Sequence, residues 1–470
     1  MKGEIFMGTE EVKMDGLPLP KRYGAIMAIA LGITVSVLDG TIANVALPTI
    51  AQDLQATPSM SIWVVNAYQL AIVVSLLSLS SLGDIWDYRK VYISGLFLFS
   101  FTSLACALSN SLWTLTIARV FQGFGAAAIT SVNTSLIRII YPQRILGRGM
   151  GINALVVAVS AAAGPTIAAG ILSIASWPWL FAINVPIGIV ALILSYKFLP
   201  FNPVRVEGRR FDWMSGWMNA LTFGLLISAI EGYAHGIDSM YIILGLAVML
   251  IVGFFFVRRQ LNQTYPLLPV DLLRIPIFAL SVGTSICSFT AQMLAMVSLP
   301  FFLQNALGRD EVITGLLLTP WPLATMLAAP LAGRLIERIH AGLLGGIGLT
   351  LFACGLFLLA TLPEVPTNAG IIWRMALCGA GFGLFQTPNN SILILSAPRQ
   401  RSGGASGMLG TSRLLGQTSG ASLVALMFAL FPHNGTHAAL YLGGAFAALA
   451  AIVSFSRISL PEPGDLSKRK

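Results

Sequence analysis

Fourteen apolar stretches, each of about 20 residues, recur along this chain. A helix of about 20 residues crosses the roughly 30 Å of hydrocarbon in a bilayer. Because lipid offers no partner to an exposed backbone N–H or C=O group, such stretches must be helices. We therefore predict an all-α integral membrane protein with fourteen transmembrane spans. The spans are placed near residues 24–48, 60–82, 91–108, 112–137, 150–174, 178–199, 214–234, 240–257, 277–302, 313–333, 341–362, 368–393, 405–431 and 438–458.

The composition excludes most other classes of protein. Hydrophobic residues make up 56% of the chain and charged residues 10%, whereas a soluble domain carries about 25% charged residues. The four cysteines form no CxxC pair, so neither a metal site nor a disulfide framework is predicted. The sequence has no GxxxxGK phosphate loop and no HExxH motif. We therefore expect no cofactor, no metal, no use of ATP and no enzyme activity.

Basic residues concentrate in alternate connections between the spans. If both termini lie in the cytoplasm, 24 of the 28 Lys and Arg residues fall on the cytoplasmic side. Only Arg309 falls outside, and Arg119, Arg374 and Arg413 fall within spans. Cytoplasmic loops of membrane proteins carry such an excess of positive charge. The pattern predicts a multi-pass protein of the bacterial cytoplasmic (inner) membrane with both termini cytoplasmic. The net charge of +9 is then explained by contact with anionic lipid and not by nucleic acid.

Two sequence motifs occur twice. An acid lies in a short basic connection after the second span (Asp84) and again after the tenth (Glu337), 253 residues apart (337 − 84). An arginine followed by glycines lies in the fourth span (Arg119) and in the twelfth (Arg374), 255 residues apart (374 − 119). The repeat therefore has an offset of eight spans, which predicts two six-helix bundles with spans 7 and 8 inserted between them. Paired bundles that rock around a central site form a known transporter architecture.

The expected organisation follows from this repeat. It comprises a cytoplasmic N-terminal segment (1–23), an N-terminal six-helix bundle (24–200), cytoplasmic linkers with the two inserted spans (201–273), a C-terminal six-helix bundle (274–459) and a cytoplasmic tail (460–470). The sequence leaves the role of the two inserted spans open.

Four segments carry family signatures. Leu38–Pro48 contains an acid followed by Thr, Asn and Ala-Leu-Pro, and Leu115–Ala128 contains Arg-x-x-Gln-Gly-x-Gly. Ser160–Gly170 contains a Gly-Pro pair in a run of small residues, and Trp177–Gly188 opens the sixth span. In combination these segments resemble the major facilitator superfamily, and specifically its 14-span drug:proton antiporter family. The resemblance covers residues 24–459 and implies the two-bundle fold and proton-coupled export of small compounds.

Asp39 is the only carboxylate clearly inside a span of either predicted bundle. An ionised side chain in mid-membrane costs at least a few kcal/mol, so it usually faces a water-filled cavity and marks a transport path. The guanidinium of Arg119 stays charged at any accessible pH and needs an acid or several carbonyls in a membrane. We predict that Arg119 acts on the protonation of Asp39, directly or through water. Two alternatives stay open. Asp39 could reach the interface or a structural partner, and Arg119 could only lock helices together through backbone carbonyls.

Other polar side chains within spans are predicted to line a substrate cavity together with Asp39. They are Asn44, Gln122, Arg374, Gln386, Asn389 and Arg413. Hydrogen bonding between helices is the competing explanation for Arg374, Arg413 and their polar neighbours. Glu231 ends the seventh span, and we expect its side chain to reach water near the outer face.

The two repeated connections are predicted to act as gating loops. The first contributes Asp84, Arg89 and Lys90, and the second contributes Gly333, Glu337 and Arg338. A carboxylate at a helix end can bind arginine or helix N-terminal N–H groups of the opposing bundle and so stabilise one orientation. Membrane topology alone explains the basic residues, but it does not explain the repeated acid. Asp87 departs from the family pattern, which has glycine at that place.

Small residues and one proline interrupt the fourth and fifth spans. Proline removes a backbone donor and bends a helix, and small side chains allow close approach between membrane helices. We predict tight or bent helix interfaces at Gly123, Gly125, Gly164, Pro165 and Gly170.

These patterns and the resemblance predict a proton-coupled antiporter that exports small amphipathic or cationic compounds, as in multidrug efflux. Its partners would be the substrate, protons and membrane lipid, and we expect a monomer. Three alternatives stay open. The first is export of an endogenous metabolite or organic anion, for which Arg119, Arg374 and Arg413 would matter more than Asp39. The others are a non-pumping sensor with a transporter fold and a channel.

Overall fold

The computed structural model describes residues 16–142, 145–202, 211–234, 236–263, 266–336, 338–363, 366–397 and 402–459. Within these residues the regular secondary structure is helical, with no β-strand. Thirteen of the described helices are long and apolar enough to cross a membrane. The predicted all-α membrane fold is therefore confirmed. Most of the two predicted terminal segments, 1–23 and 460–470, lies outside the described residues.

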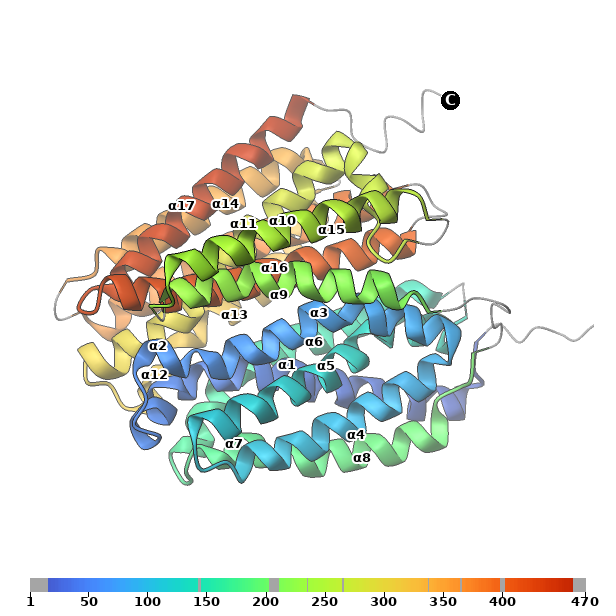
Figure 1. Ribbon diagram of the computed structural model, residues 1–470, viewed down its shortest axis with the longest axis horizontal. Helices are drawn as coiled ribbons and strands as arrows, with labels where there is room; N and C mark the ends of the chain where they lie inside the picture. Colours follow the sequence, from blue (N-terminus) through green and yellow to red (C-terminus); the bar gives the residue numbers. More distant parts are fainter. Residues whose placement is uncertain are drawn as a thin grey trace, which may run out of the picture.

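The first six predicted spans form one bundle (Figure 1). Within it α5 packs against α3 and α4, and α1 packs against α6 and α8. The bundle contains α1 (Leu19–Asp53), α2 (Pro58–Ser61), α3 (Trp63–Ile85), α4 (Tyr88–Ala107), α5 (Leu112–Ile140), α6 (Leu146–Leu172), α7 (Pro178–Ala182) and α8 (Asn184–Phe198). The short helices α2 and α7 are the first turns of the second and sixth spans.

The last six predicted spans form the second bundle, drawn in yellow to red in Figure 1. Here α15 packs against α13 and α14, and α11 packs against α16 and α17. The bundle contains η2 (Val270–Arg274), α11 (Pro276–Phe301), η3 (Phe302–Ala306), α12 (Glu311–Leu318), α13 (Pro320–Leu335), α14 (Ala341–Ala360), α15 (Asn368–Leu395), α16 (Ser402–Leu430), α17 (Gly435–Ser456) and η5 (Arg457–Ser459).

The helix α15 occupies the position of the predicted twelfth span. It is 28 residues long, but it is absent from the thirteen helices that are apolar enough by composition. Arg374, Gln386 and Asn389 lower its apolar character. Its close packing against α13 and α14 explains how a polar helix fits there, because protein and not lipid surrounds much of its surface.

A proline lies near the end of the first long helix of each bundle. Pro48 lies near the end of α1, and Pro300 lies near the end of α11. A π-helical segment, η3, begins two residues after Pro300. Proline removes an intrahelical hydrogen bond, so these are the places where the first helix of each bundle can depart from a straight axis.

The inserted helices α9 (Trp213–Ala234) and α10 (Ser239–Leu261) form a hairpin. In Figure 1 the hairpin, drawn in green, lies across the junction of the two bundles, and α9 packs against α3 of one bundle and α16 of the other. At the base of the hairpin Arg259 forms a 3.0 Å ion pair with Asp212. Burial raises the pKa of the Asp212 carboxyl, but hydrogen bonds from Ser215, Arg259 and Gln263 outweigh burial, so this pKa lies below its ordinary value.

Candidate functional site

A buried ion pair lies in the interior of the N-terminal bundle. Asp39 on α1 accepts hydrogen bonds at Oδ2 from Nη1 of Arg119 on α5, and both side chains are about 1% exposed. The amides of Gln122 on α5 and Asn184 on α8 each donate to Asp39 Oδ1 at 2.9 Å. Three helices therefore converge on one carboxylate, and each of its oxygens has a donor.

The guanidinium of Arg119 is held from a fourth helix as well. Its Nε donates to the carbonyl oxygen of Val64 on α3 at 2.9 Å, and its Nη1 donates to Gln122 Oε1 at 2.7 Å. The ring centroid of Tyr68 lies 4.1 Å from Cζ, so the cation also rests on an aromatic face. Because arginine keeps its charge at any accessible pH, the contact fits an ionised Asp39 in this conformation.

The structure brings together the two residues that the sequence linked. Asp39 and Arg119 are in direct contact. Arg119 also binds the backbone carbonyl of Val64, as expected if it locks helices together. The effect of Arg119 on proton binding stays a prediction. Asn184 was missed as a partner of Asp39. The available signal was an amide within the apolar run Phe181–Gly188, where a polar side chain needs a hydrogen-bonding partner.

The other predicted cavity residues are divided between the two bundles, and their role in binding a substrate stays a prediction. The pair with Gln122 and the buried Asn44 lie within the N-terminal bundle. Asn389 lies inside the C-terminal bundle, where its amide donates to Ser285 Oγ at 2.9 Å. Arg374 donates to the Gly370 carbonyl at 2.7 Å near the start of α15. The remaining two, Gln386 and Arg413, are half-buried.

Arg457, one of the 24 basic residues that the charge pattern places on the cytoplasmic side, is a buried cation. Its side chain is fully buried, which the sequence did not indicate. Its guanidinium donates to Asn389 Oδ1 at 2.6 Å, to Ser281 Oγ at 2.9 Å and to Ser454 Oγ at 2.6 Å. Asn389 on α15 therefore accepts a hydrogen bond from a buried arginine at the end of α17, and this contact joins two helices of the C-terminal bundle.

A cavity of about 320 Å³ lies between α1 and α6. Leu38, the neighbour of Asp39, lines it, and most of the lining is apolar. Two hydroxyl groups interrupt this lining, and Ser160 donates to Thr34 at 3.2 Å. The remaining lining residues are Leu155, Val156, Val159, Ala163 and Ile167.

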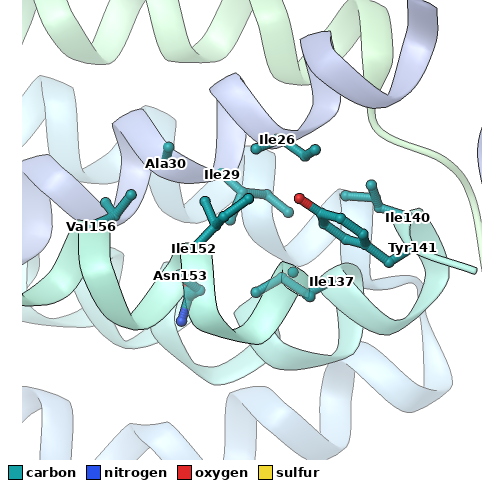
Figure 2. Close-up of a pocket in the computed structure, with 10 residues that line it drawn as sticks. Ile26, Ile29, Ala30, Ile137, Ile140, Tyr141, Ile152, Asn153 and Val156 are labelled. Carbon is teal, nitrogen blue, oxygen red and sulfur yellow. The ribbon is translucent and has the colours of Figure 1, made fainter. Parts of the chain in front are cut away.

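A second pocket lies among α1, α5 and α6 (Figure 2). Isoleucines from all three helices line it, with Tyr141 at one end and Asn153 at the other side. Ile29, one of its lining residues, precedes Asp39 by ten positions on α1, or about 15 Å along the helix. This pocket is therefore separate from the ion pair.

The two bundles are hydrogen-bonded to each other near the side that the charge pattern predicts to be outer. Thr49 on α1 donates to Glu311 on α12 at 3.2 Å, and Gln304 in η3 donates to the carbonyl of Val45 at 3.1 Å. Further contacts join Gln52 to Asn305 at 3.4 Å, Ser59 to the carbonyl of Ala425 at 3.4 Å and Thr166 to Thr319 at 2.9 Å. These contacts join the two bundles on that side, so the structure is closed there.

The first predicted gating loop is tied to the end of α8. The Tyr88 hydroxyl donates to Asp84 at 2.6 Å, and the guanidinium of Arg89 donates to the carbonyl of Tyr196 and lies 4.3 Å from the ring centroid of Phe201. Lys90 is exposed. The gating role of these residues stays a prediction.

Asp87 is a residue of this loop that sequence reasoning did not select. It is fully buried, caps α4 by accepting from the Arg89 backbone N–H at 2.8 Å, and accepts from the Asn202 backbone N–H at 3.1 Å. Its departure from the family's glycine was the signal. In the second loop Gly333 is half-buried and Arg338 is exposed, while Glu337 lies outside the described residues.

Most of the predicted small-residue interfaces are tight. A Cβ at Gly123 would lie 2.5 Å from the Tyr68 carbonyl oxygen, and a Cβ at Gly164 would lie 2.0 Å from Thr41 Oγ1. Gly125 packs in the same way against α4, and the Pro165 carbonyl approaches α12 of the other bundle at Gly315. Gly170 differs, because a Cβ there would meet nothing within 4 Å. The prediction of a close interface at Gly170 was therefore wrong.

The expectation for Glu231 was also wrong. Its side chain is 1% exposed and does not reach water. Instead the Asn66 amide on α3 donates to Glu231 Oε1. The sequence placed the residue at the end of an apolar helix, but it did not show that this helix end packs against both bundles.

Comparison with known proteins identifies relatives over the whole fold. The sequence profile named Major Facilitator Superfamily matches residues 29–421 and 280–470. A protein of Escherichia coli K12 named "Uncharacterized transporter YebQ" is 66% identical over 96% of this chain and 99% of its own length. The multidrug resistance protein Stp of Mycobacterium tuberculosis is 31% identical, with coverage of 86% and 75%. The riboflavin transporter RibZ of Clostridioides difficile is 29% identical, with coverage of 87% and 89%.

Solved structures share the fold at low sequence identity. A POT family transporter in complex with a thioalcohol-conjugated peptide superposes with a TM-score of 0.70 at 14% identity, covering 93% of this chain and 95% of that one. A D-xylose–proton symporter gives a TM-score of 0.67 at 15% identity, covering 94% and 98%. These likenesses agree with the two-bundle arrangement.

Proposed function

Since the chain belongs to the major facilitator superfamily and is a multi-pass membrane transporter, we propose that it exports small amphipathic or cationic compounds in exchange for protons. The site of exchange would be the bacterial inner membrane, with both chain termini in the cytoplasm.

The buried Asp39–Arg119 pair carries the proposal. Protonation of Asp39 would leave the charge of Arg119 without its partner in a site that excludes water, and breaking one side of a buried pair costs about 3–5 kcal/mol. Proton binding is therefore expected to require a rearrangement around Arg119. A ligand shifts a conformational equilibrium only if it binds the two states differently, and the pair gives the proton this differential affinity.

The helix α1 offers a path from the pair to the contacts between the bundles. Asp39 and Thr49 lie ten residues apart on this helix, or about 15 Å. In the conformation closed on the predicted outer side, Thr49 binds Glu311 and Asp39 binds Arg119. We infer that opening of the outer side and proton uptake by Asp39 accompany each other. Inward movement of one proton supplies about 2.3 kcal/mol per 100 mV of membrane potential.

The character of the cargo is inferred from the cavity between α1 and α6. A largely apolar space of about 320 Å³, lined by Leu38 next to the acid, fits an apolar or amphipathic body of small size. Two relatives are named for drug export, the multidrug resistance protein Stp and the tetracenomycin C resistance and export protein of Streptomyces glaucescens, which is 30% identical. Both observations support export of small organic compounds.

A second candidate function is transport of an endogenous organic compound, including organic anions. The likeness to the riboflavin transporter RibZ favours it. In addition, Arg374 and Arg413 lie half-buried in the C-terminal bundle with no ion pair among the described contacts. Cargo of this class would depend on these two arginines more than on Asp39.

Reconstitution into vesicles with an imposed pH gradient tests the proposal. Dyes, quaternary ammonium compounds and riboflavin are offered in parallel, and accumulation is compared between the wild type and Asp39→Asn. Accumulation of a cationic or amphipathic compound against its gradient, abolished by dissipating the pH gradient and by Asp39→Asn, is expected. Accumulation that ignores the pH gradient would refute proton exchange, and the absence of accumulation for every compound would favour the non-pumping alternatives.

A further inference from the structure

Glu231 lies where the inserted helix α9 meets both bundles. Its side chain is almost fully buried, and the Asn66 amide of α3 donates a hydrogen bond to its Oε1. The hydroxyl of Ser422 on α16 faces the same carboxyl. Asn66 and Ser422 are themselves fully buried. One carboxyl group on an inserted helix therefore interacts with a helix from each bundle, and we call this place the three-helix junction.

The helix α3 connects the three-helix junction to the Asp39–Arg119 pair. Arg119 binds the carbonyl of Val64, and Asn66 lies two residues further along the same helix. The Tyr68 ring, again two residues further, rests on the guanidinium of Arg119. The start of α3 is thus held by Arg119 at one place and by Glu231 at another. A displacement of α3 changes both contacts.

We propose that Glu231 is a second proton-binding residue of the transport cycle, placed by the inserted helix where the two bundles separate and rejoin. The proposal rests on the proposed function, because it links proton binding to movement of the bundles. In the proton-binding step one O–H bond forms at a carboxylate oxygen, and one O–H bond breaks in a hydronium ion of the water that reaches the opened junction, which leaves a water molecule. Glu231 acts through α3 and α16, so it is a positioning residue for the exchange.

The burial of Glu231 determines which state of the three-helix junction its protonation favours. A carboxyl group costs far less free energy to bury with its proton than as an anion, and water in an open junction stabilises the anion. Protonation of Glu231 therefore favours the closed three-helix junction, and ionisation favours the open one. The inserted hairpin then has a function beyond packing, since it adds an acid to an interface formed otherwise by two bundles.

Several titratable or charged groups lie on the elements around Glu231. They are Tyr68 and Asp84 of α3, Tyr241, Arg258 and Arg259 of α10, Arg413 of α16, Tyr233 of α9 and Asp238 between α9 and α10. His235, four residues after Glu231 in the sequence, lies outside the described residues. Asp84, Arg258 and Arg259 lie at the far ends of their helices from Glu231. Arg413 precedes Ser422 by nine residues, or about 13 Å along α16.

A distance measurement that needs no substrate tests the proposal. Spin labels are attached to Met60→Cys on α2 and Leu430→Cys at the end of α16, two exposed positions on opposite bundles. The full-length chain, with its native cysteines replaced, is placed in lipid nanodiscs, and the distance between the labels is followed by pulsed EPR from mildly acidic to mildly alkaline pH. Glu231→Gln, which resembles the protonated form, is compared with Asp238→Asn, which removes an exposed acid of the same hairpin and keeps a side chain able to cap α10.

Proton uptake by Asp39 is proposed to accompany opening of the outer side, whereas proton uptake by Glu231 favours closure, so the effect of Glu231 is measured as a difference between variants. As the pH rises, the wild type and Asp238→Asn are expected to shift toward longer distances relative to Glu231→Gln, which retains only the contribution of Asp39. Asn66→Ala, which removes the donor to the carboxyl, provides a milder variant and is expected to shift the pH midpoint of this difference without abolishing it. The same pH response in Glu231→Gln and in the wild type would overturn the proposal.

The vesicle experiment separates this proposal from the proposed function. If vesicles show no pH-driven transport while the label distance still depends on pH through Glu231, proton exchange is refuted and the proton-binding role of the junction holds. If pH-driven transport is present and Glu231→Gln keeps the wild-type distance response, proton exchange holds and Glu231 has a structural role only.

Discussion

The hydroxyl of Thr49 on α1 lies 3.2 Å from the Glu311 carboxylate on α12 and joins the first helix of the N-terminal bundle to the C-terminal bundle. Thr49 belongs to the same helix as Asp39. A single helix therefore carries both the buried acid and a contact that closes the predicted outer side. A substitution at Thr49 can therefore change the conformation while Asp39 stays intact.

Thr49→Val is expected to populate conformations that are open on the predicted outer side. A hydrogen bond to a charged group contributes about 1.5–3 kcal/mol, so losing it should shift the equilibrium roughly tenfold toward the open state. The labels at Met60→Cys and Leu430→Cys report this shift as a longer mean distance. Thr102→Val serves as the matched control, because the Thr102 hydroxyl bonds only within its own helix among the described contacts. Equal distances in both variants would show that the Thr49–Glu311 contact does not hold the bundles together.

Asp39→Asn and a double variant distinguish a role of the Asp39–Arg119 pair in proton coupling from a role in stability. The single variant keeps the shape of the side chain but leaves Arg119 without its counter-charge, and we expect a loss of about 3–5 kcal/mol in the free energy of unfolding. Asp39→Asn with Arg119→Gln removes both charges and should recover most of that stability. Thermal unfolding in detergent measures the recovery, and vesicle transport measures coupling. Recovered stability without pH-driven transport is expected. Recovered pH-driven transport in the double variant would show that the pair is structural.

Much of the fold could be predicted because its signals are local. Hydrophobic length defined the spans, and the spacing of Arg119 and Arg374 defined the two bundles. The pairing of Asp39 with Arg119 was also within reach, because an arginine and an acid buried in neighbouring spans have few other partners. The helix α15 was also predicted as a span, and the structure explains its polar residues, because the helix packs against α13 and α14.

The contacts that sequence reasoning missed depend on which face of a helix meets a neighbour. The helix α9 is apolar around most of its surface, so no stripe revealed that Glu231 points toward α3 and α16. Arg457 follows the positive-inside pattern at a helix end, yet the packing of α11, α14 and α17 encloses it. Asn184 lies on the sixth span, far in sequence from the acid that it binds. Each of these contacts arises from tertiary packing, which local patterns do not specify.

Two glycines of α6 should respond in opposite ways to alanine. A Cβ at Gly164 would overlap Thr41 on α1, whereas a Cβ at Gly170 would enter open space. Gly164→Ala is expected to lower stability by about 1–3 kcal/mol through overpacking. Gly170→Ala should be neutral or stabilising by up to about 1 kcal/mol, because alanine favours helix. Thermal unfolding of the two variants in detergent checks this, and a destabilised Gly170→Ala would mean that α6 packs closely at Gly170 after all.

The ion pair at the base of the inserted hairpin should give a pH-dependent contribution to stability. Hydrogen bonds from Ser215, Arg259 and Gln263 hold the pKa of Asp212 below its ordinary value in the folded state. In the unfolded state an Asp titrates near pH 3.9. The stabilisation is therefore fully present above about pH 4 and falls as the pH drops through the folded-state pKa. Asp212→Asn should therefore lower stability at neutral pH by up to about 1 kcal/mol, the range for partly exposed pairs. The difference from the wild type should shrink below about pH 4. Thermal unfolding at neutral and acidic pH measures this difference, with Asp238→Asn as the control acid of the same hairpin. A difference that grows on acidification would mean that Asp212 is bound in its protonated form.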